Sequence, residues 1–179
     1  MSETTFGCGK NVLPGFKQLD VIPYKNVDFV CNARDLGQFS DEPIAEIYAS
    51  HVLEHFKRSE TVNVLVEWNR VLIKGGIIRL AVPDFAAIAA EYTAAKNLNG
   101  CQGLLYGGQT YDFNFHHMAF DFALLQKFLQ DANFTNIELY DWRDFLPEDY
   151  DDYSRAYLPH MDFANGRAMS LNVIAVKPP

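Results

Sequence analysis

Apolar and polar positions follow two different spacings along this chain. Short apolar runs bounded by Gly, Pro, Asn, Asp or Ser are typical of strands. They predict strands at residues 4–7, 17–22, 27–32, 46–50, 77–82, 136–140 and 170–177. Apolar residues that recur every three or four positions are typical of amphipathic helices. They predict helices at residues 59–72, 85–97 and 120–134. Strands that alternate with helices indicate an α/β fold around a mostly parallel sheet.

Capping residues mark the expected helix ends. Ser59 is expected to be the N-cap of the first helix, and Gly75-Gly76 is expected to end it. Asp84 follows an apolar strand and is expected to cap the second helix. In open α/β sheets a ligand binds at the carboxyl ends of the strands, where the strand order reverses. We therefore look for the site in the loops that follow the first four strands.

The N-terminal half has little room for helices. The residues between Gly9 and Leu19 include Pro14-Gly15 and cannot hold a three-turn helix. Four residues, 23–26, join the second and third strands, whereas a parallel crossover normally takes about a dozen. The third strand is therefore either short and irregular or not parallel. One flank of the sheet is then thinly covered, and we expect a partner subunit, as in a homodimer, to bury it.

Composition narrows the function. The 179 residues form one domain, 49% hydrophobic and 21% charged, with a formal net charge of −8. A net negative charge repels phosphate groups, so neither nucleic acid nor an anionic membrane is an expected partner. The chain has no apolar stretch long enough to span a bilayer and no secretory leader. With an odd number of scattered cysteines (three), these features predict a cytoplasmic protein.

A glycine-rich turn, Gly7-Cys8-Gly9-Lys10, follows the first strand. It is too short for a P-loop, and Val12 replaces the third glycine of a dinucleotide-binding motif. The turn is followed in order by CNARDL at 31–36, YASHVLEHF at 48–56 and WNRVLIKGGIIRLAVPDF at 68–85. Together these motifs resemble the class I S-adenosylmethionine-dependent methyltransferases, and among them the type 11-like group, over roughly residues 4–86.

The resemblance implies a Rossmann-like, seven-stranded, mostly parallel sheet with an antiparallel final strand, here with a shortened N-terminal half. It implies S-adenosylmethionine as cofactor. The glycine turn would pass under the methionine part, Asp20 would bind both ribose hydroxyls, and Leu36 would pack on the adenine. The cofactor-binding residues implied in this way are Gly7, Cys8, Gly9, Lys10, Asp20, Asn32, Ala33, Leu36, Ser50 and His51.

Methyl transfer from a sulfonium requires alignment of the acceptor and removal of its proton, and it requires no metal. Histidine titrates near neutral pH and suits proton removal. The candidate bases are His51, His55, His116, His117 and Asp84. Each also has a structural interpretation, as a helix cap or a hydrogen-bonding loop residue.

Residues 51–55, His-Val-Leu-Glu-His, also fit the HxxEH motif of zinc metallopeptidases. That chemistry needs both histidines on one face of a helix, with the glutamate as base. Here His51 directly follows a predicted strand, and Ser59 is expected to begin the next helix. We therefore favour the methyltransferase interpretation, with no metal site, over a metallopeptidase.

Residues 141–168 form an insertion between the last two predicted strands, in which acidic and aromatic residues alternate. It is either a solvated loop with aromatic anchors or a lid that favours a neutral or cationic acceptor. The leading hypothesis is a methyltransferase that acts on an unidentified small-molecule or saccharide-like acceptor. The alternatives are a non-catalytic S-adenosylmethionine-binding module of the same fold and, third, the zinc metallopeptidase.

Overall fold

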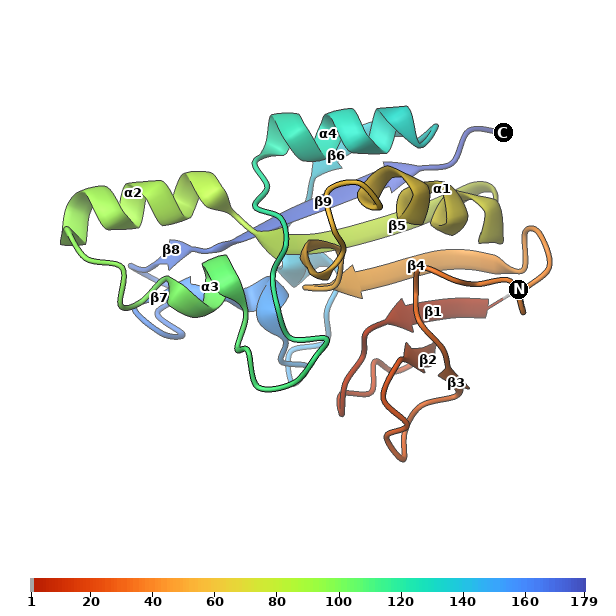
Figure 1. Ribbon diagram of the computed structural model, residues 1–179, viewed down its shortest axis with the longest axis horizontal. Coiled ribbons are helices and arrows are strands. Elements are labelled where there is room, and N and C mark those ends of the chain that lie inside the picture. The colour runs from red at the N-terminus through yellow and green to blue at the C-terminus, as the bar shows by residue number, and fades with distance from the viewer. Residues whose placement is uncertain (1) are drawn as a thin grey trace.

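The computed structural model describes residues 2–179 and has a central seven-stranded sheet (Figure 1). Its strands, in the order β3-β2-β1-β4-β5-β9-β6, are β3 (Phe29–Val30), β2 (Phe16–Asp20), β1 (Ser2–Phe6), β4 (Ile44–Ser50), β5 (Leu72–Pro83), β9 (Ser170–Val176) and β6 (Thr135–Leu139). The first five strands are parallel, and β9 is antiparallel to both β5 and β6. The strand order reverses between β1 and β4, which confirms the expected sheet. Open α/β sheets bind ligands at such a reversal.

Four α-helices and a small second sheet complete the described residues. The helices are α1 (Thr61–Val71), α2 (Phe85–Ala95), α3 (Gln102–Tyr106) and α4 (Phe122–Asp131), and the short strands β7 (Tyr157–Leu158) and β8 (Arg167–Ala168) pair with each other. Three 3₁₀ turns are η1 (Leu53–His55), η2 (Trp142–Asp144) and η3 (Tyr153–Arg155). Among residues 2–179 no helix has both the length and the apolar character that crossing a membrane requires.

The first predicted helix has different ends in the structure. Its N-cap is Glu60, which makes no side-chain capping bond, so the expectation for Ser59 was wrong. The helix ends at Val71, because Leu72 is extended and pairs with Ile44 as the start of β5. Gly75-Gly76 lies inside β5, where the register with β4 shifts. A Cβ atom at Gly76 would lie 2.8 Å from the carbonyl oxygen of Ile73, so the glycine pair permits a bulge and does not end a helix.

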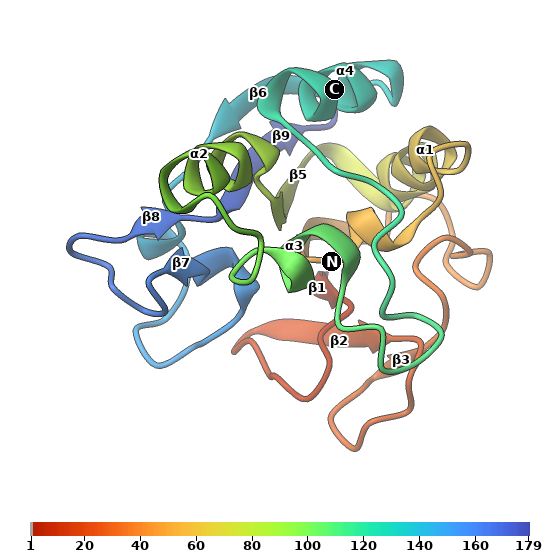
Figure 2. The ribbon, with the colours of Figure 1, turned by 60° about the vertical axis from the view of Figure 1, so that its left-hand side comes forward.

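Two layers cover the sheet. Helices α1 and α4 lie on one face, where Phe6, Ile47, Trp68 and Leu125 belong to the main hydrophobic core (Figure 1). The opposite face of β2 and β4 is covered by the insertion 141–168, drawn in blue on the other side of the sheet in Figure 2. Its aromatic cluster consists of Leu13, Tyr48, Trp142, Leu146 and Tyr150, with Phe16, Phe145 and Phe163 packed against it. The chain itself therefore covers this face of β2 and β4, and the expected homodimer stays a prediction.

The connections in the N-terminal half are as short as expected. Residues 7–15 form turns without a helix, and β3 has only two residues, Phe29 and Val30, in parallel register with Leu19 and Asp20. Of the two alternatives for the third strand, the short one is thus confirmed. The Asp28 carboxylate accepts the backbone N–H of Gln18 at 2.8 Å. That bond ties the loop before β3 to β2 in place of a crossover helix.

Candidate functional site

The glycine turn after β1 requires glycine at both positions. Gly7 and Gly9 have φ angles of +64° and +58°, a region that other residues enter only at a cost. A Cβ atom on Gly7 would lie 2.5 Å from Cγ2 of Val52, so the backbone here packs directly on the segment after β4. A Cβ atom on Gly9 would meet nothing within 4 Å, because Gly9 faces open space. Gly7 therefore allows the loop to pack closely, and Gly9 borders open space that a ligand can occupy.

The side chain of Asp20, at the end of β2, turns toward this loop. Its Oδ2 atom accepts the backbone N–H of Gly9 at 2.8 Å, and its Oδ1 atom accepts that of Ile22 at 2.8 Å. A carboxylate oxygen can accept more than one hydrogen bond, so both oxygens keep capacity for further donors such as a pair of hydroxyls. The sequence placed the glycines and the acid in separate motifs, and the structure brings them together.

Two cavities meet at the carboxyl ends of β1 and β4. The smaller, of about 300 Å³, is lined by Asp20, Asn32, Ala33 and His117, among others. The larger, of about 760 Å³, is lined by several residues of the insertion 141–168 and by α3 and its flanks. The residues that line both cavities are Gly7, Gly9, His51, His55 and Tyr111. A long ligand can therefore extend from one cavity into the other across the glycine turn.

Most of the implied cofactor residues line these cavities, and one does not. Cys8, Lys10 and Ser50 line the larger cavity. Burial and the nearby Asp20 carboxylate raise the pKa of the Cys8 thiol to about 12, so it is protonated at neutral pH. Leu36 lines neither cavity, because its side chain is fully buried in the main core. We therefore do not retain Leu36 as a residue that packs on the adenine.

Helix α1 holds the segment that carries Asn32 and Ala33. The Trp68 indole N–H donates to the carbonyl oxygen of Ala33 at 2.6 Å. The Arg70 guanidinium donates to the carbonyl oxygens of Leu36 and Phe39, at 3.1 and 3.0 Å. These bonds fix one wall of the smaller cavity from the core side.

His51 lies at the end of β4 in a constrained conformation. Its φ angle is +52°, and its side chain is nearly buried. Its Nδ1 atom is 3.2 Å from Oε1 of Glu54, and its Nε2 atom is 3.2 Å from the Ser170 hydroxyl. Burial alone would raise the pKa of the Glu54 carboxyl, but the neighbouring rings of His51, His55 and His116 hold it below its ordinary value.

The other candidate bases fall into two groups. His55 and His116 line the larger cavity, and their ring centroids are 4.8 Å apart. His117 lines the smaller cavity, and its backbone N–H donates to the carbonyl oxygen of Glu54. Asp84 lines neither cavity and accepts the N–H of Ala86 at 2.9 Å as the N-cap of α2. Asp84 is therefore a capping residue, and the structure gives it no place at the site.

The structure does not meet the requirement of the HxxEH motif for an α-helix. His51 follows the end of β4, and Leu53–His55 is a single 3₁₀ turn, so the motif does not lie on an α-helix. His51 and His55 consequently do not occupy one helical face, as a metallopeptidase of that class needs.

Several residues that line the cavities belong to no motif in the sequence. Tyr111, in the segment between α3 and α4, lines both cavities, and Tyr150 and Tyr153 from the insertion line the larger one. The Tyr48 hydroxyl on β4 donates to Oδ2 of Asp152 at 2.6 Å and so anchors the insertion next to the cavity. Only the aromatic and acidic composition of 141–168 hinted at this role.

Comparisons with known proteins find one family model and several solved structures that are similar to this chain. Residues 14–80 match the family model described as a methyltransferase domain. Comparison of the sequence with curated proteins finds no match. A methyltransferase structure from Archaeoglobus fulgidus has a TM-score of 0.58 at 12% identity, covering 98% of this chain and 86% of that one. One from Thermotoga maritima has a TM-score of 0.57 at 16% identity, covering 98% and 82%.

A third similar structure is the 1,6-didemethyltoxoflavin-N1-methyltransferase of Burkholderia thailandensis, with 1,6-didemethyltoxoflavin and S-adenosylhomocysteine bound. Its TM-score is 0.59 at 13% identity, over 99% of this chain and 71% of that one. At these identities the structural likeness shows a shared fold. The family model covers residues 14–80, less than half of the chain, and the fold over nearly the whole chain is that of S-adenosylmethionine-dependent methyltransferases.

Proposed function

We propose that this protein transfers a methyl group from S-adenosylmethionine to a small-molecule or saccharide-like acceptor. The observation that carries the proposal is the contact between Asp20 and Gly9 at the junction of the two cavities. It joins an acid suited to a ribose with a backbone turn open to a ligand, at the strand-order reversal where such folds bind ligands.

In this proposal the smaller cavity holds the adenosine part of the cofactor. Asp20 accepts hydrogen bonds from the ribose hydroxyls, and Asn32 and Ala33 lie beside the adenine. Gly7, Cys8, Gly9 and Lys10 border the methionine part, and Ser50 and His51 lie beside the sulfonium. The line of these residues from one cavity into the other supports this assignment.

The larger cavity then holds the acceptor. S-adenosylmethionine would supply a methyl group bound to a sulfonium. An oxygen, nitrogen, carbon or sulfur atom of the acceptor forms a bond to the methyl carbon as the carbon–sulfur bond breaks, and S-adenosylhomocysteine leaves. The cavity wall positions that atom and excludes water, and a histidine takes the acceptor's proton. His51, His55 and His116 are the candidates for this step. The tyrosines and carboxylates of residues 150–153 suit a neutral, hydroxyl-bearing or cationic molecule.

Titration calorimetry with S-adenosylhomocysteine tests the cofactor part. We expect binding of one molecule per chain and an affinity loss of about tenfold to a hundredfold in Asp20→Ala, because hydrogen bonds to a charged group are lost. Asp41→Asn is a matched control, because the Asp41 carboxylate is exposed, pairs with Arg70 and lines neither cavity. A folded wild-type protein that binds no S-adenosylhomocysteine would refute the proposal.

Turnover is tested by release of S-adenosylhomocysteine from S-adenosylmethionine in the presence of sugars, phenols, amines and thiols. Release that depends on one acceptor class and is lost in Asp20→Ala supports an enzyme. Tight binding without release across these classes would favour a non-catalytic module of the same fold. All three cysteines, Cys8, Cys31 and Cys101, are unpaired, which supports the cytoplasm as the place of action.

A further inference from the structure

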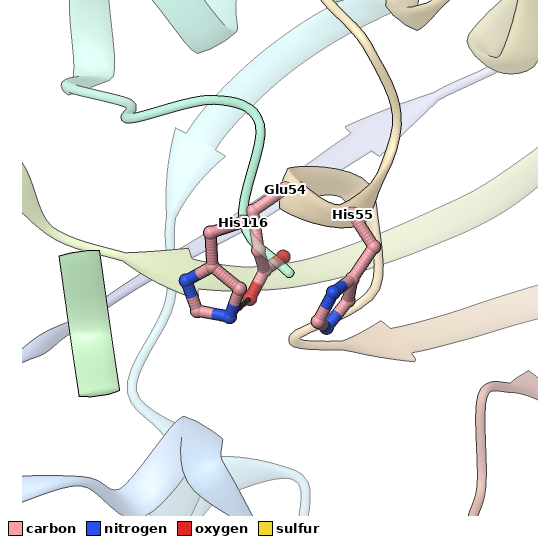
Figure 3. A group of neighbouring side chains, drawn as sticks. All are labelled: Glu54, His55 and His116. Carbon is pink, nitrogen blue, oxygen red and sulfur yellow. Dashed lines mark ion pairs between the residues drawn. The ribbon is translucent and has the colours of Figure 1, made fainter. Parts of the chain in front are cut away.

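Glu54, His55 and His116 lie close together, with their side chains directed toward one another (Figure 3). Glu54 and His55 come from the 3₁₀ turn η1 after β4, and His116 comes from the segment between α3 and α4. Each residue offers one ligand atom, and the three atoms all lie within 4.8 Å of one another. Oε1 of Glu54 is 3.8 Å from Nε2 of His116. Two imidazoles and a carboxylate from separate segments thus share one small volume.

The Glu54 carboxylate lacks a partner suited to its burial. Its side chain is 0% exposed, and neither oxygen receives a hydrogen bond of good geometry from residues 2–179. Nδ1 of His51 lies 3.2 Å from Oε1, which is an ion-pair distance without hydrogen-bond alignment. A buried carboxylate is costly unless a cation or several donors compensate it. The site therefore has a place for a positive charge next to Glu54.

The two histidines hold their rings in the orientation that a metal ligand needs. Nδ1 of His55 is 3.1 Å from the carbonyl oxygen of Phe115, and Nδ1 of His116 is 2.9 Å from that of Leu104. A carbonyl oxygen only accepts, so each Nδ1 atom carries the hydrogen. Each neutral ring then keeps a lone pair on Nε2. Metal-bound histidines are typically held in this way, by a backbone carbonyl on the other nitrogen.

We propose that Glu54, His55 and His116 bind a divalent transition metal such as Zn²⁺. Two imidazole nitrogens and one carboxylate oxygen are a common donor set for such ions and leave a coordination position open. His55 and His116 both line the larger cavity, so an ion can reach them from it. Metal–ligand bonds of about 2.0 to 2.2 Å require the three atoms to move closer together when the ion binds. His51 supports the set from outside, 3.2 Å from the Glu54 carboxylate.

This site differs from the HxxEH arrangement, because His51 is not a ligand and His116 comes from another segment. It also does not rest on the methyl-transfer proposal, because its test measures metal binding alone. If the ion is bound, the Nε2 atoms of His55 and His116 cannot accept a proton, and His51 remains as the histidine for that step.

The test uses the full chain without a purification tag, stripped by a chelator. Calorimetry with Zn²⁺ should show one ion per chain, and Co²⁺ should give the visible absorption bands of a nitrogen- and oxygen-bound ion. His116→Asn and Glu54→Gln should each weaken Zn²⁺ binding at least tenfold and alter the Co²⁺ spectrum. Since Glu54 is deeply buried, His55→Ala at the half-buried position provides a further variant if Glu54→Gln fails to fold.

His117→Asn and His160→Asn are the matched controls. Both histidines are exposed and line a cavity, but neither belongs to the cluster. They should retain the wild-type affinity and spectrum. Failure of the wild-type chain to bind one ion would overturn the proposal. Binding that His55→Ala and His116→Asn leave unchanged, or that His117→Asn or His160→Asn abolishes, would overturn it as well.

Discussion

The backbone N–H of Gly9 donates a 2.8 Å hydrogen bond to the carboxylate of Asp20. Gly9 follows β1 and Asp20 ends β2, so this bond joins two loops at the same edge of the sheet. Residues 7–15 contain no helix that could fix the turn in the usual way. The acid therefore holds the turn in place before any ligand enters and keeps lone pairs for a bound nucleoside.

The two glycines of this turn should respond differently to alanine. Gly7→Ala adds a Cβ atom 2.5 Å from Val52 at a positive φ, so we expect a stability loss of about 3 kcal/mol. Gly9→Ala meets no protein atom, so we expect a loss of only about 1 kcal/mol, from the φ angle. Its Cβ atom would point into ligand space and lower the affinity for S-adenosylhomocysteine at least tenfold.

Urea unfolding measures the first effect, and calorimetry with S-adenosylhomocysteine measures the second. If Gly9→Ala kept the wild-type affinity, the open space at Gly9 would not be part of the cofactor site. Equal stability losses in the two variants would contradict the role given to Val52.

The parts of the fold that follow from local patterns were predictable from the sequence. The buried strand at 77–82 and the cap at Asp84 depend on hydrophobic runs and on a short-range hydrogen bond, and both are present. Gly75-Gly76 was misread because a glycine pair after an amphipathic segment is equally compatible with a helix end and a strand bulge. The pairing of Leu72 with Ile44 decides between them, and that contact is not local.

In the candidate site, too, local motifs were predictable from the sequence and long-range contacts were not. Asp20 and the glycine turn were predicted from the order of the motifs, and the structure shows that they are hydrogen-bonded at the strand ends. Leu36 was misplaced because its exposure depends on how the segment after β3 folds onto the core. The insertion could not be placed at all, since nothing in the residues 141–168 specifies that Tyr48 and Phe16 on the sheet are their packing partners.

The hydrogen bond between Tyr48 and Asp152 should anchor the insertion. Tyr48→Phe removes a 2.6 Å bond to a carboxylate, so we expect a stability loss of about 1.5 to 3 kcal/mol and faster proteolysis near residues 150–161. Tyr140→Phe is a matched control, because the buried Tyr140 hydroxyl has no hydrogen-bond partner within the described chain. That change should be neutral or slightly stabilising. Similar losses in both variants would show that the Asp152 bond contributes little.

Cys8 should be unreactive although it lines the larger cavity. Its thiol pKa of about 12 leaves almost no thiolate at pH 7.5, and the thiolate is the reactive form. We expect iodoacetamide to leave Cys8 unlabelled in the native protein and to label it after unfolding, as read by peptide mass spectrometry. Cys8→Ala should keep the affinity for S-adenosylhomocysteine within about threefold. Rapid native labelling would contradict the buried, protonated state.

The clamp between Arg70 and Glu67 gives a pH-dependent prediction. Arg70 donates from Nε and from its second terminal nitrogen to the Glu67 carboxylate, and these hydrogen bonds hold the pKa of Glu67 below its ordinary value of 4.5. Because the folded-state pKa is lower than the unfolded one, the ionised form stabilises the fold above about pH 4.5. That contribution is lost as the pH falls through the folded-state pKa.

Glu67→Gln should therefore lower the free energy of unfolding by about 1 kcal/mol at pH 7, a modest value because the pair is partly exposed. The difference from wild type should shrink below pH 4.5, as the wild-type carboxyl also becomes neutral. Urea unfolding between pH 3 and 7 measures this difference.

Asp131→Asn is the control, because it breaks the exposed pair with Lys127 on α4; it should change stability by less than about 0.5 kcal/mol over this pH range. A Glu67→Gln difference that stayed constant down to pH 3 would show that the neutral carboxyl contributes as much as the charged one. The contacts that Arg70 makes with Leu36, Phe39 and Asp41 would then depend on hydrogen bonding and packing, and not on the charge of Glu67.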